Sequence, residues 1–129
     1  MGASVSLRRR VQWMDTDAAG IWHHSTLIRW AEEAEAEMHR ELGIIDQTFG
    51  VTPRVKLEFE FLAPVRFDDE VQVILSVGRL GESSIEYLVD VDKDGQPIAT
   101  GSMIAVLIDG ETGESRPWPD ELRGPLSGS

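Results

Sequence analysis

The chain contains no cysteine. It can therefore form no disulfide, and it has neither a thiolate nucleophile nor a cysteine-based metal site. It also lacks any apolar run of about 18 residues, so no membrane-spanning helix is expected. The basic run Arg8-Arg9-Arg10 is not followed by the apolar stretch of a secretory signal. These absences predict a cytoplasmic protein.

Basic residues are scarce as well. The 12 Lys and Arg side chains face 23 Asp and Glu, which gives a formal net charge of −11. This balance argues against nonspecific binding to nucleic acids or to anionic membranes, because both need a basic surface. An anionic ligand such as coenzyme A would need a local basic patch. With 129 residues, 41% of them apolar, the chain is expected to form one domain over residues 1–129.

Hydrophobic periodicity predicts one strand, one long helix and then four further strands. The first strand alternates apolar and polar residues, although Arg9 interrupts its apolar side. The helix carries an apolar stripe, and we expect its glutamates to lie on a solvated face. Ser25 or Thr26 is expected to cap its start, and His39 and Arg40 suit the dipole at its end. The expected strands are 4–13, 55–61, 71–77, 85–91 and 97–108, the helix is 24–42, and the segment from about 116 is expected to be irregular.

This order of elements predicts an α+β fold with a mainly antiparallel sheet. The sheet must bury its apolar face against the one long helix, so we expect it to curl around that helix. A single helix covers only part of a five-stranded sheet. A second copy of the chain is therefore expected to bury the remaining edge and apolar surface, which predicts at least a homodimer.

The segment between the first strand and the helix carries the strongest chemical signal. Asp15 and Asp17 lie one residue apart, and Gly20 permits a backbone with positive φ or a close approach to a ligand. A carboxylate at this place would lie near the unpaired N–H groups of a helix start. Such a carboxylate can attack or hydrate a carbonyl while the N–H donors hold the oxyanion. We expect Asp15 to have the structural role, closing the turn or accepting backbone N–H bonds.

A metal site is not expected. His23 and His24 are adjacent, so their side chains would point about 100° apart on a helix and chelate one ion poorly. The only other histidine is His39, and cysteine is absent. The predicted chemistry needs no metal or other cofactor.

The run Asp15-Thr16-Asp17-Ala18-Ala19-Gly20-Ile21, with a following His and with Trp30 in the helix, resembles the opening motif of the 4-hydroxybenzoyl-CoA thioesterase family. These proteins are hotdog-fold acyl-CoA thioesterases, in which a five-stranded antiparallel sheet wraps around one long central helix. The resemblance implies hydrolysis of an acyl-CoA or carrier-protein thioester. It makes Asp17 the nucleophile or general base, and it places the oxyanion against backbone N–H groups from Gly20 to His24. It also implies a homodimer or homotetramer.

The resemblance further suggests where the substrate binds. The candidates for the acyl pocket are Trp22, Leu27, Trp30, Phe59 and Phe61, although large apolar residues are also typical of a plain core. In this family the phosphates of CoA often bind near the turn that here holds Arg79, Ser83 and Ser84. The same turn contains Gly81-Glu82 and is less basic than in relatives with firm nucleotide contacts.

Three alternatives remain open at this point. The protein could bind acyl thioesters without hydrolysing them, or it could be an acyl-CoA dehydratase on the same fold. A different hotdog lineage carries its catalytic glutamate on the central helix, where Glu33 or Glu37 would serve.

Overall fold

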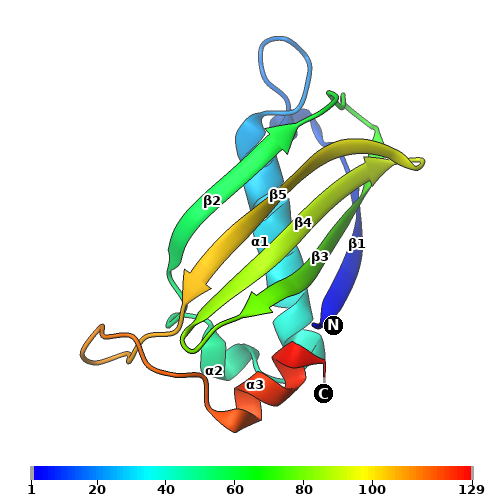
Figure 1. Cartoon of the computed structure of the whole chain (residues 1–129). Coiled ribbons are helices and arrows are strands. Elements are labelled where there is room, and N and C mark those ends of the chain that lie inside the picture. Colours follow the sequence, from blue (N-terminus) through cyan, green and yellow to red (C-terminus); the bar gives the residue numbers. More distant parts are fainter. Residues whose placement is uncertain (1, 129) are drawn as a thin grey trace.

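A five-stranded antiparallel sheet forms the body of the molecule in the computed structural model, which describes residues 2–128. The strand order is β1-β3-β4-β5-β2, so β1 and β2 lie at the two edges (Figure 1). The prediction of an α+β fold with a five-stranded antiparallel sheet is confirmed. The strands are β1 (Ser4–Arg10), β2 (Arg54–Phe61), β3 (Glu70–Leu80), β4 (Ser84–Lys93) and β5 (Gln96–Val106).

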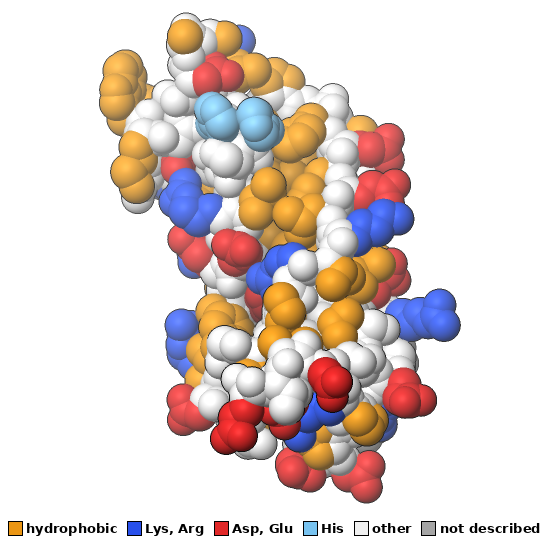
Figure 2. All heavy atoms as spheres, turned by 90° about the vertical axis from the view of Figure 1, so that its left-hand side faces the viewer, with side chains coloured by type: hydrophobic (Ala, Val, Ile, Leu, Met, Phe, Trp, Pro, Cys, Tyr) orange, Lys and Arg blue, Asp and Glu red, His pale blue; other side chains and the backbone are white. Residues whose placement is uncertain are grey.

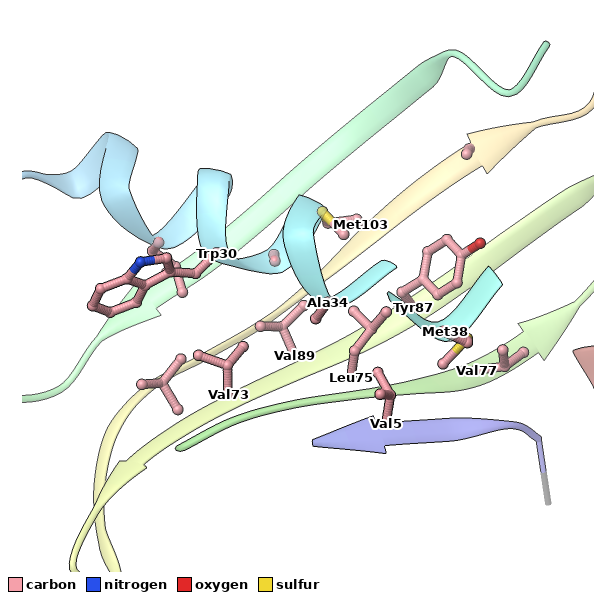
Figure 3. Packing of buried hydrophobic residues seen from close by; sticks show 14 of the residues in the cluster. Val5, Trp30, Ala34, Met38, Val73, Leu75, Val77, Tyr87, Val89 and Met103 are labelled. Atoms are coloured by element: carbon pink, nitrogen blue, oxygen red, sulfur yellow. The ribbon is translucent and has the colours of Figure 1, made fainter. Parts of the chain in front are cut away.

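The long helix α1 (His24–Glu41) crosses one face of this sheet. Its apolar stripe points at the strands, and Trp30, Ala34 and Met38 meet side chains of β3, β4 and β5 (Figure 3). Burying one large apolar side chain contributes about 1.5–3 kcal/mol, so this stripe holds the helix on the sheet. The cap differs from the prediction: His23 precedes the helix, and its Nδ1 accepts the N–H of Ser25 at 3.1 Å.

The first strand is shorter than predicted and ends at Arg10. Beyond it, Val11 donates its N–H to the carbonyl of Asp69, and the chain turns through the short 3₁₀ segment η1 (Trp13–Asp15). A short helix, α2 (Ile45–Thr48), lies in the connection before β2. The bond between Val11 and Asp69 joins residues that are far apart in the sequence, which a local alternation pattern does not report.

The prediction of an irregular segment from about residue 116 is wrong. Residues Asp120–Ser127 form the helix α3, which buries Leu122 and Leu126 completely. Pro125 and Gly124 disfavour a helix locally, but the two leucines are four residues apart and share one face. The packing of that face overrides the propensity. The N–H of Ala3 also donates to the carbonyl of Leu126, which joins the two end regions of the described chain.

Two polar residues of α1 are buried, although Glu35 was expected to face solvent and His39 to complement the dipole at the end of the helix. Glu35 is 1% exposed and receives a forked pair of bonds from Arg54, of which the Nη1–Oε2 bond is 3.0 Å. His39 is fully buried, with Nδ1 2.6 Å from the Thr48 hydroxyl and Nε2 2.7 Å from the Tyr87 hydroxyl. Glu35 therefore does not face solvent, and His39 does not serve the helix dipole, because each side chain bonds a side chain of another element.

Burial, together with the nearby charge of Arg54, lowers the pKa of His39 from 6.5 to about 4. The unfolded chain therefore binds more protons than the folded one between these pH values, and stability falls as pH falls through that window. Between pH 7.5 and pH 5.0, we expect the wild type to lose about 2 kcal/mol more unfolding free energy than His39→Gln. Urea titrations at both pH values measure this difference. Equal pH dependence in the two proteins would contradict it.

Candidate active site

A tight hairpin presents Asp17 between β1 and α1. The N–H of Asp17 donates to the carbonyl of Ile21 at 2.8 Å, and the N–H of Gly20 donates back to the carbonyl of Asp17 at 2.9 Å. Gly20 has φ of 80°, a conformation that glycine adopts without strain. The Oδ1 atom of Asp17 accepts the N–H of Ala19 at 2.8 Å. The hairpin thus fixes an exposed carboxylate in one orientation.

Asp15 fastens this hairpin to the helix. Its side chain is 2% exposed, accepts the N–H of Gln12 at 2.7 Å and forms an ion pair with Arg29 of α1. Its carbonyl accepts the N–H of His23 at 2.7 Å and the hydroxyl of Thr26 at 3.0 Å. The structural role predicted for Asp15 is therefore confirmed. The buried carboxylate of Asp15 is paired with Arg29, whereas the carboxylate of Asp17 is exposed.

Asp17 borders a cavity of about 410 Å³ beside the start of α1. One wall is the hairpin with the first residue of the helix, and the other is the last residue of β2 with the segment that follows it. The two walls are tied together because Trp22 donates its N–H to the carbonyl of Val65 at 2.8 Å. The lining residues are Asp17, Ile21, Trp22, His24, Phe61, Leu62, Ala63 and Pro64.

The cavity combines aromatic walls with the positive end of a helix. The rings of Trp22 and Phe61 meet edge to face, with centroids 5.7 Å apart. His24 is the first residue of α1, and among residues 2–128 its N–H has no hydrogen-bond partner. Figure 2 shows the two adjacent histidines, His23 and His24, at one end of a strip of hydrophobic side chains. A carboxylate, a free N–H donor and an apolar pocket are thus brought together.

The structure assembles some of the residues predicted for the site and leaves others out. Asp17, Trp22 and His24 line the cavity. Gly20 shapes the hairpin, but its N–H is already bonded to Asp17 and is not available to a ligand. Trp30 lies behind Trp22 in the core, with centroids 5.7 Å apart.

Among the predicted substrate residues, Phe59 and Ser84 do not line this cavity. The ring of Phe59 lies over Gly101 of β5, where a side chain on residue 101 would overlap it, whereas Phe61, the other phenylalanine predicted for the pocket, does line the cavity. Ser84 starts β4 at the opposite end of the sheet from the hairpin (Figure 1). Its carbonyl accepts the indole N–H of Trp118.

Several lining residues were not singled out from the sequence. Ile21 follows Gly20 in the motif, and Leu62-Ala63-Pro64 follows β2. The signal was present, because Phe61 to Val65 is an apolar run that continues past the end of an alternating strand. Among residues 2–128, no group of three or more His, Cys, Asp or Glu side chains could hold a metal ion. Within the same range, no helix has the length and apolar character needed to cross a membrane.

Known proteins resemble this chain over most of its length. Residues 11–126 match the model of the thioesterase-like superfamily. A 1,4-dihydroxy-2-naphthoyl-CoA hydrolase of Synechococcus sp. (strain WH7803) is 30% identical, with 97% of this chain and 90% of the relative covered. A solved gentisyl-coenzyme A thioesterase is 27% identical with a TM-score of 0.81, covering 95% of this chain and 98% of that one. At 20% identity, a 1,4-dihydroxy-2-naphthoyl-CoA thioesterase from Synechocystis shares the fold, with a TM-score of 0.84 and 95% of each chain covered.

These relatives confirm the predicted hotdog fold and the prediction that the protein is an enzyme that hydrolyses thioesters. The narrower resemblance to the 4-hydroxybenzoyl-CoA thioesterase family stays a prediction. On the match over residues 11–126 and the 30% identity to a full-length relative, the chain belongs to the thioesterase-like superfamily.

Proposed function

We propose that the protein hydrolyses the thioester of an aromatic acyl-CoA to the free acid and CoA. The observation that carries this proposal is the cavity in which the Asp17 carboxylate and the amino end of α1 meet two aromatic walls. The relatives also support an aromatic acyl group, since two of them are named for aromatic CoA thioesters. A carrier-protein thioester, the other donor that the motif allowed, has no such support.

In this proposal Asp17 acts as the nucleophile or as the general base for a water molecule. As a base, it takes a proton from the water while the water oxygen bonds to the thioester carbon. The carbonyl oxygen then carries negative charge and accepts the free N–H of His24 at the positive end of the helix. Collapse of this intermediate breaks the C–S bond, and the CoA sulfur leaves as a thiolate. No metal or other cofactor takes part in these steps.

Thiol release from a panel of acyl-CoA thioesters tests the proposal. The panel contains 1,4-dihydroxy-2-naphthoyl-CoA, benzoyl-CoA and acetyl-CoA. Because burying an aromatic ring contributes about 2–3 kcal/mol, we expect kcat/KM for the better aromatic thioester to exceed that for acetyl-CoA by about 50-fold. If acetyl-CoA were the best substrate, the assignment of an aromatic acyl group would be wrong. Absence of thiol release from all three would reject hydrolysis of acyl-CoA.

We also propose that two copies pair along β2. The outer edge of β2 has no partner strand among residues 2–128, and its apolar residues Val55, Leu57 and Phe61 are 61%, 42% and 48% exposed. The opposite face carries the row Lys56, Glu58 and Glu60. In a two-fold antiparallel pair centred on Leu57, Lys56 meets Glu58 of the second copy and Glu58 meets its Lys56, so the row is self-complementary.

Sedimentation velocity at micromolar concentration tests this assembly. We expect a species of at least twice the 14.3 kDa chain mass, and we expect Leu57→Lys to shift it toward the monomer. The matched control is Leu88→Lys, which changes an exposed leucine of the inner strand β4. A monomeric wild type would contradict the pairing. A tetramer would join two such pairs and stays a prediction.

A further inference from the structure

A second cavity, of about 380 Å³, lies between β1 and the first half of α1. Its lining contains four arginines, a third of the 12 basic residues of a chain whose net charge is −11. Two carboxylates share the lining, and two more, Glu70 and Asp68, pair with arginines at its edge, so four carboxylates balance the four guanidinium charges. What the cavity offers to a ligand is therefore a set of unused N–H donors on clustered guanidinium groups. The lining residues are Arg8, Arg9, Arg10, Gln12, Asp15, Arg29, Trp30 and Glu33.

Arg9 occupies a position where the fold would ordinarily place an apolar side chain. It shares the parity of Val5, Leu7 and Val11, whose side chains are buried or partly buried beneath α1. Its Nε donates to Glu33 at 2.7 Å, and its Nη1 donates to the carbonyl of Arg8 at 3.0 Å. These bonds hold the guanidinium at the cavity, and among residues 2–128 its Nη2 has no partner. A charged side chain in place of a core residue departs from the local pattern, and such departures are expected mainly at functional or strained sites.

Arg29 reaches the same cavity from the helix. Its Nη2 donates to the buried carboxylate of Asp15, while Nε and Nη1 have no partner within residues 2–128. The side chains of Arg9 and Arg29 are 34% and 43% exposed, so both are oriented by a carboxylate and open to solvent on the other side. Arg8 and Arg10 form the rim, where each contacts Glu70, at 3.5 Å and 3.2 Å, and Arg10 also contacts Asp68 at 3.3 Å.

We propose that this arginine cavity binds a phosphate-bearing anion, and that in the proposed reaction this anion is the nucleotide end of CoA. A guanidinium that is held in place with free donors suits the oxygens of a phosphate, which accept two parallel N–H bonds. The identification with CoA rests on the proposed function, whereas the anion site itself does not.

The position of the arginine cavity supports this identification. Asp15 lines the arginine cavity and Asp17 lines the site, and from Asp15 the arginine cavity extends along β1 to Arg8. A ligand whose anionic end is separated from its reacting group by a long arm can therefore reach both cavities. Trp30 and Trp22 likewise line one cavity each, and their rings are 5.7 Å apart. By contrast, the turn at Arg79, Ser83 and Ser84 lies at the opposite end of the sheet from Asp17 (Figure 1).

Calorimetric titration with 3′,5′-adenosine diphosphate and with inorganic pyrophosphate tests the anion site. We expect the wild type to bind both, and we expect Arg9→Gln to weaken binding about tenfold, the effect of losing one charge-assisted contact. The matched control is Arg40→Gln, which removes an equal charge and an ion pair with Glu37 on an exposed part of α1. It is expected to change binding less than about twofold. If the wild type bound neither compound, or if Arg9→Gln and Arg40→Gln behaved alike, the anion site would be wrong.

Steady-state kinetics separate CoA from another phosphate compound. If the cavity holds the nucleotide of CoA, Arg9→Gln raises KM for the best acyl-CoA about tenfold with kcat retained, and leaves KM for the matching acyl-pantetheine unchanged. If Arg9→Gln abolishes pyrophosphate binding but leaves KM for acyl-CoA unchanged, the ligand is a separate phosphate compound and the assignment to CoA is wrong. Should the panel show no thiol release, the titrations alone decide on the anion site, so this failure is distinguishable from that of the proposed function.

Discussion

Replacement of Asp17 by asparagine is expected to lower kcat for the best acyl-CoA by about 10³-fold, because an amide can neither attack the thioester nor take a proton from water. The amide oxygen of asparagine still accepts the N–H of Ala19, so the hairpin keeps its shape. The pocket walls are unchanged, and KM is expected to stay within about threefold of the wild type. Thiol release under saturating substrate measures kcat directly.

Asp109→Asn is the matched control for this variant. Asp109 also lies in an exposed turn, and its Oδ1 accepts the N–H of Glu111 at 2.8 Å, so the same chemical change is made in a similar backbone setting. We expect this control to retain full activity. If Asp17→Asn retained half or more of the wild-type kcat, Asp17 would not be the catalytic carboxylate.

Replacement of Arg54 by methionine is expected to lower the unfolding free energy by about 3–5 kcal/mol, because it leaves a buried carboxylate without its partner. The side chain of Glu35 is 2% exposed and that of Arg54 is 23% exposed. Burial alone would lower the pKa of Arg54, but the hydrogen bonds and charge of Glu35 outweigh it and raise the pKa, so the cation is firmly held. Equilibrium unfolding in urea, extrapolated linearly to water, gives the free energy.

Two further variants separate the buried charge from other causes. Arg40→Met breaks the exposed ion pair with Glu37 and is expected to cost less than about 1 kcal/mol. The double variant Arg54→Met with Glu35→Met removes both charges, and we expect it to regain about half or more of the stability lost by Arg54→Met. If the double variant were no more stable than Arg54→Met, the loss would come from packing and not from the unpaired carboxylate.

The strands and the long helix were predictable because their signals are local. Each strand shows an alternation of period two, and α1 shows an apolar stripe, within one stretch of sequence. The roles of Glu35 and His39 were not predictable in this way, because their partners Arg54 and Tyr87 lie 19 and 48 residues further on. The helix α3 was not predictable either, because it forms through the packing of Leu122 and Leu126 against other parts of the core.

In the candidate site, too, only the part whose signal is local could be predicted. The motif around Asp17 and Gly20 describes one hairpin, so its turn and the position of the carboxylate followed from the sequence. The opposite wall comes from the segment after β2. The choice between Phe59 and Phe61 depends on how the ring of Phe59 lies over Gly101 of a neighbouring strand. No pattern within β2 distinguishes these two residues, since they share one parity.

The hydrogen bond between Ala3 and Leu126 also bears on how the chain folds during synthesis. β1 pairs with β3, where Ser4 lies opposite Ser76. The first strand to be synthesised therefore cannot form its ladder of hydrogen bonds until β3 has been made. Ribosomes add about 5–20 residues per second, so α1 spends several seconds outside the ribosome before β5 completes the sheet beneath it. During that time its apolar stripe is uncovered. We therefore expect the nascent chain to need protection by chaperones until residues 120–127 have emerged.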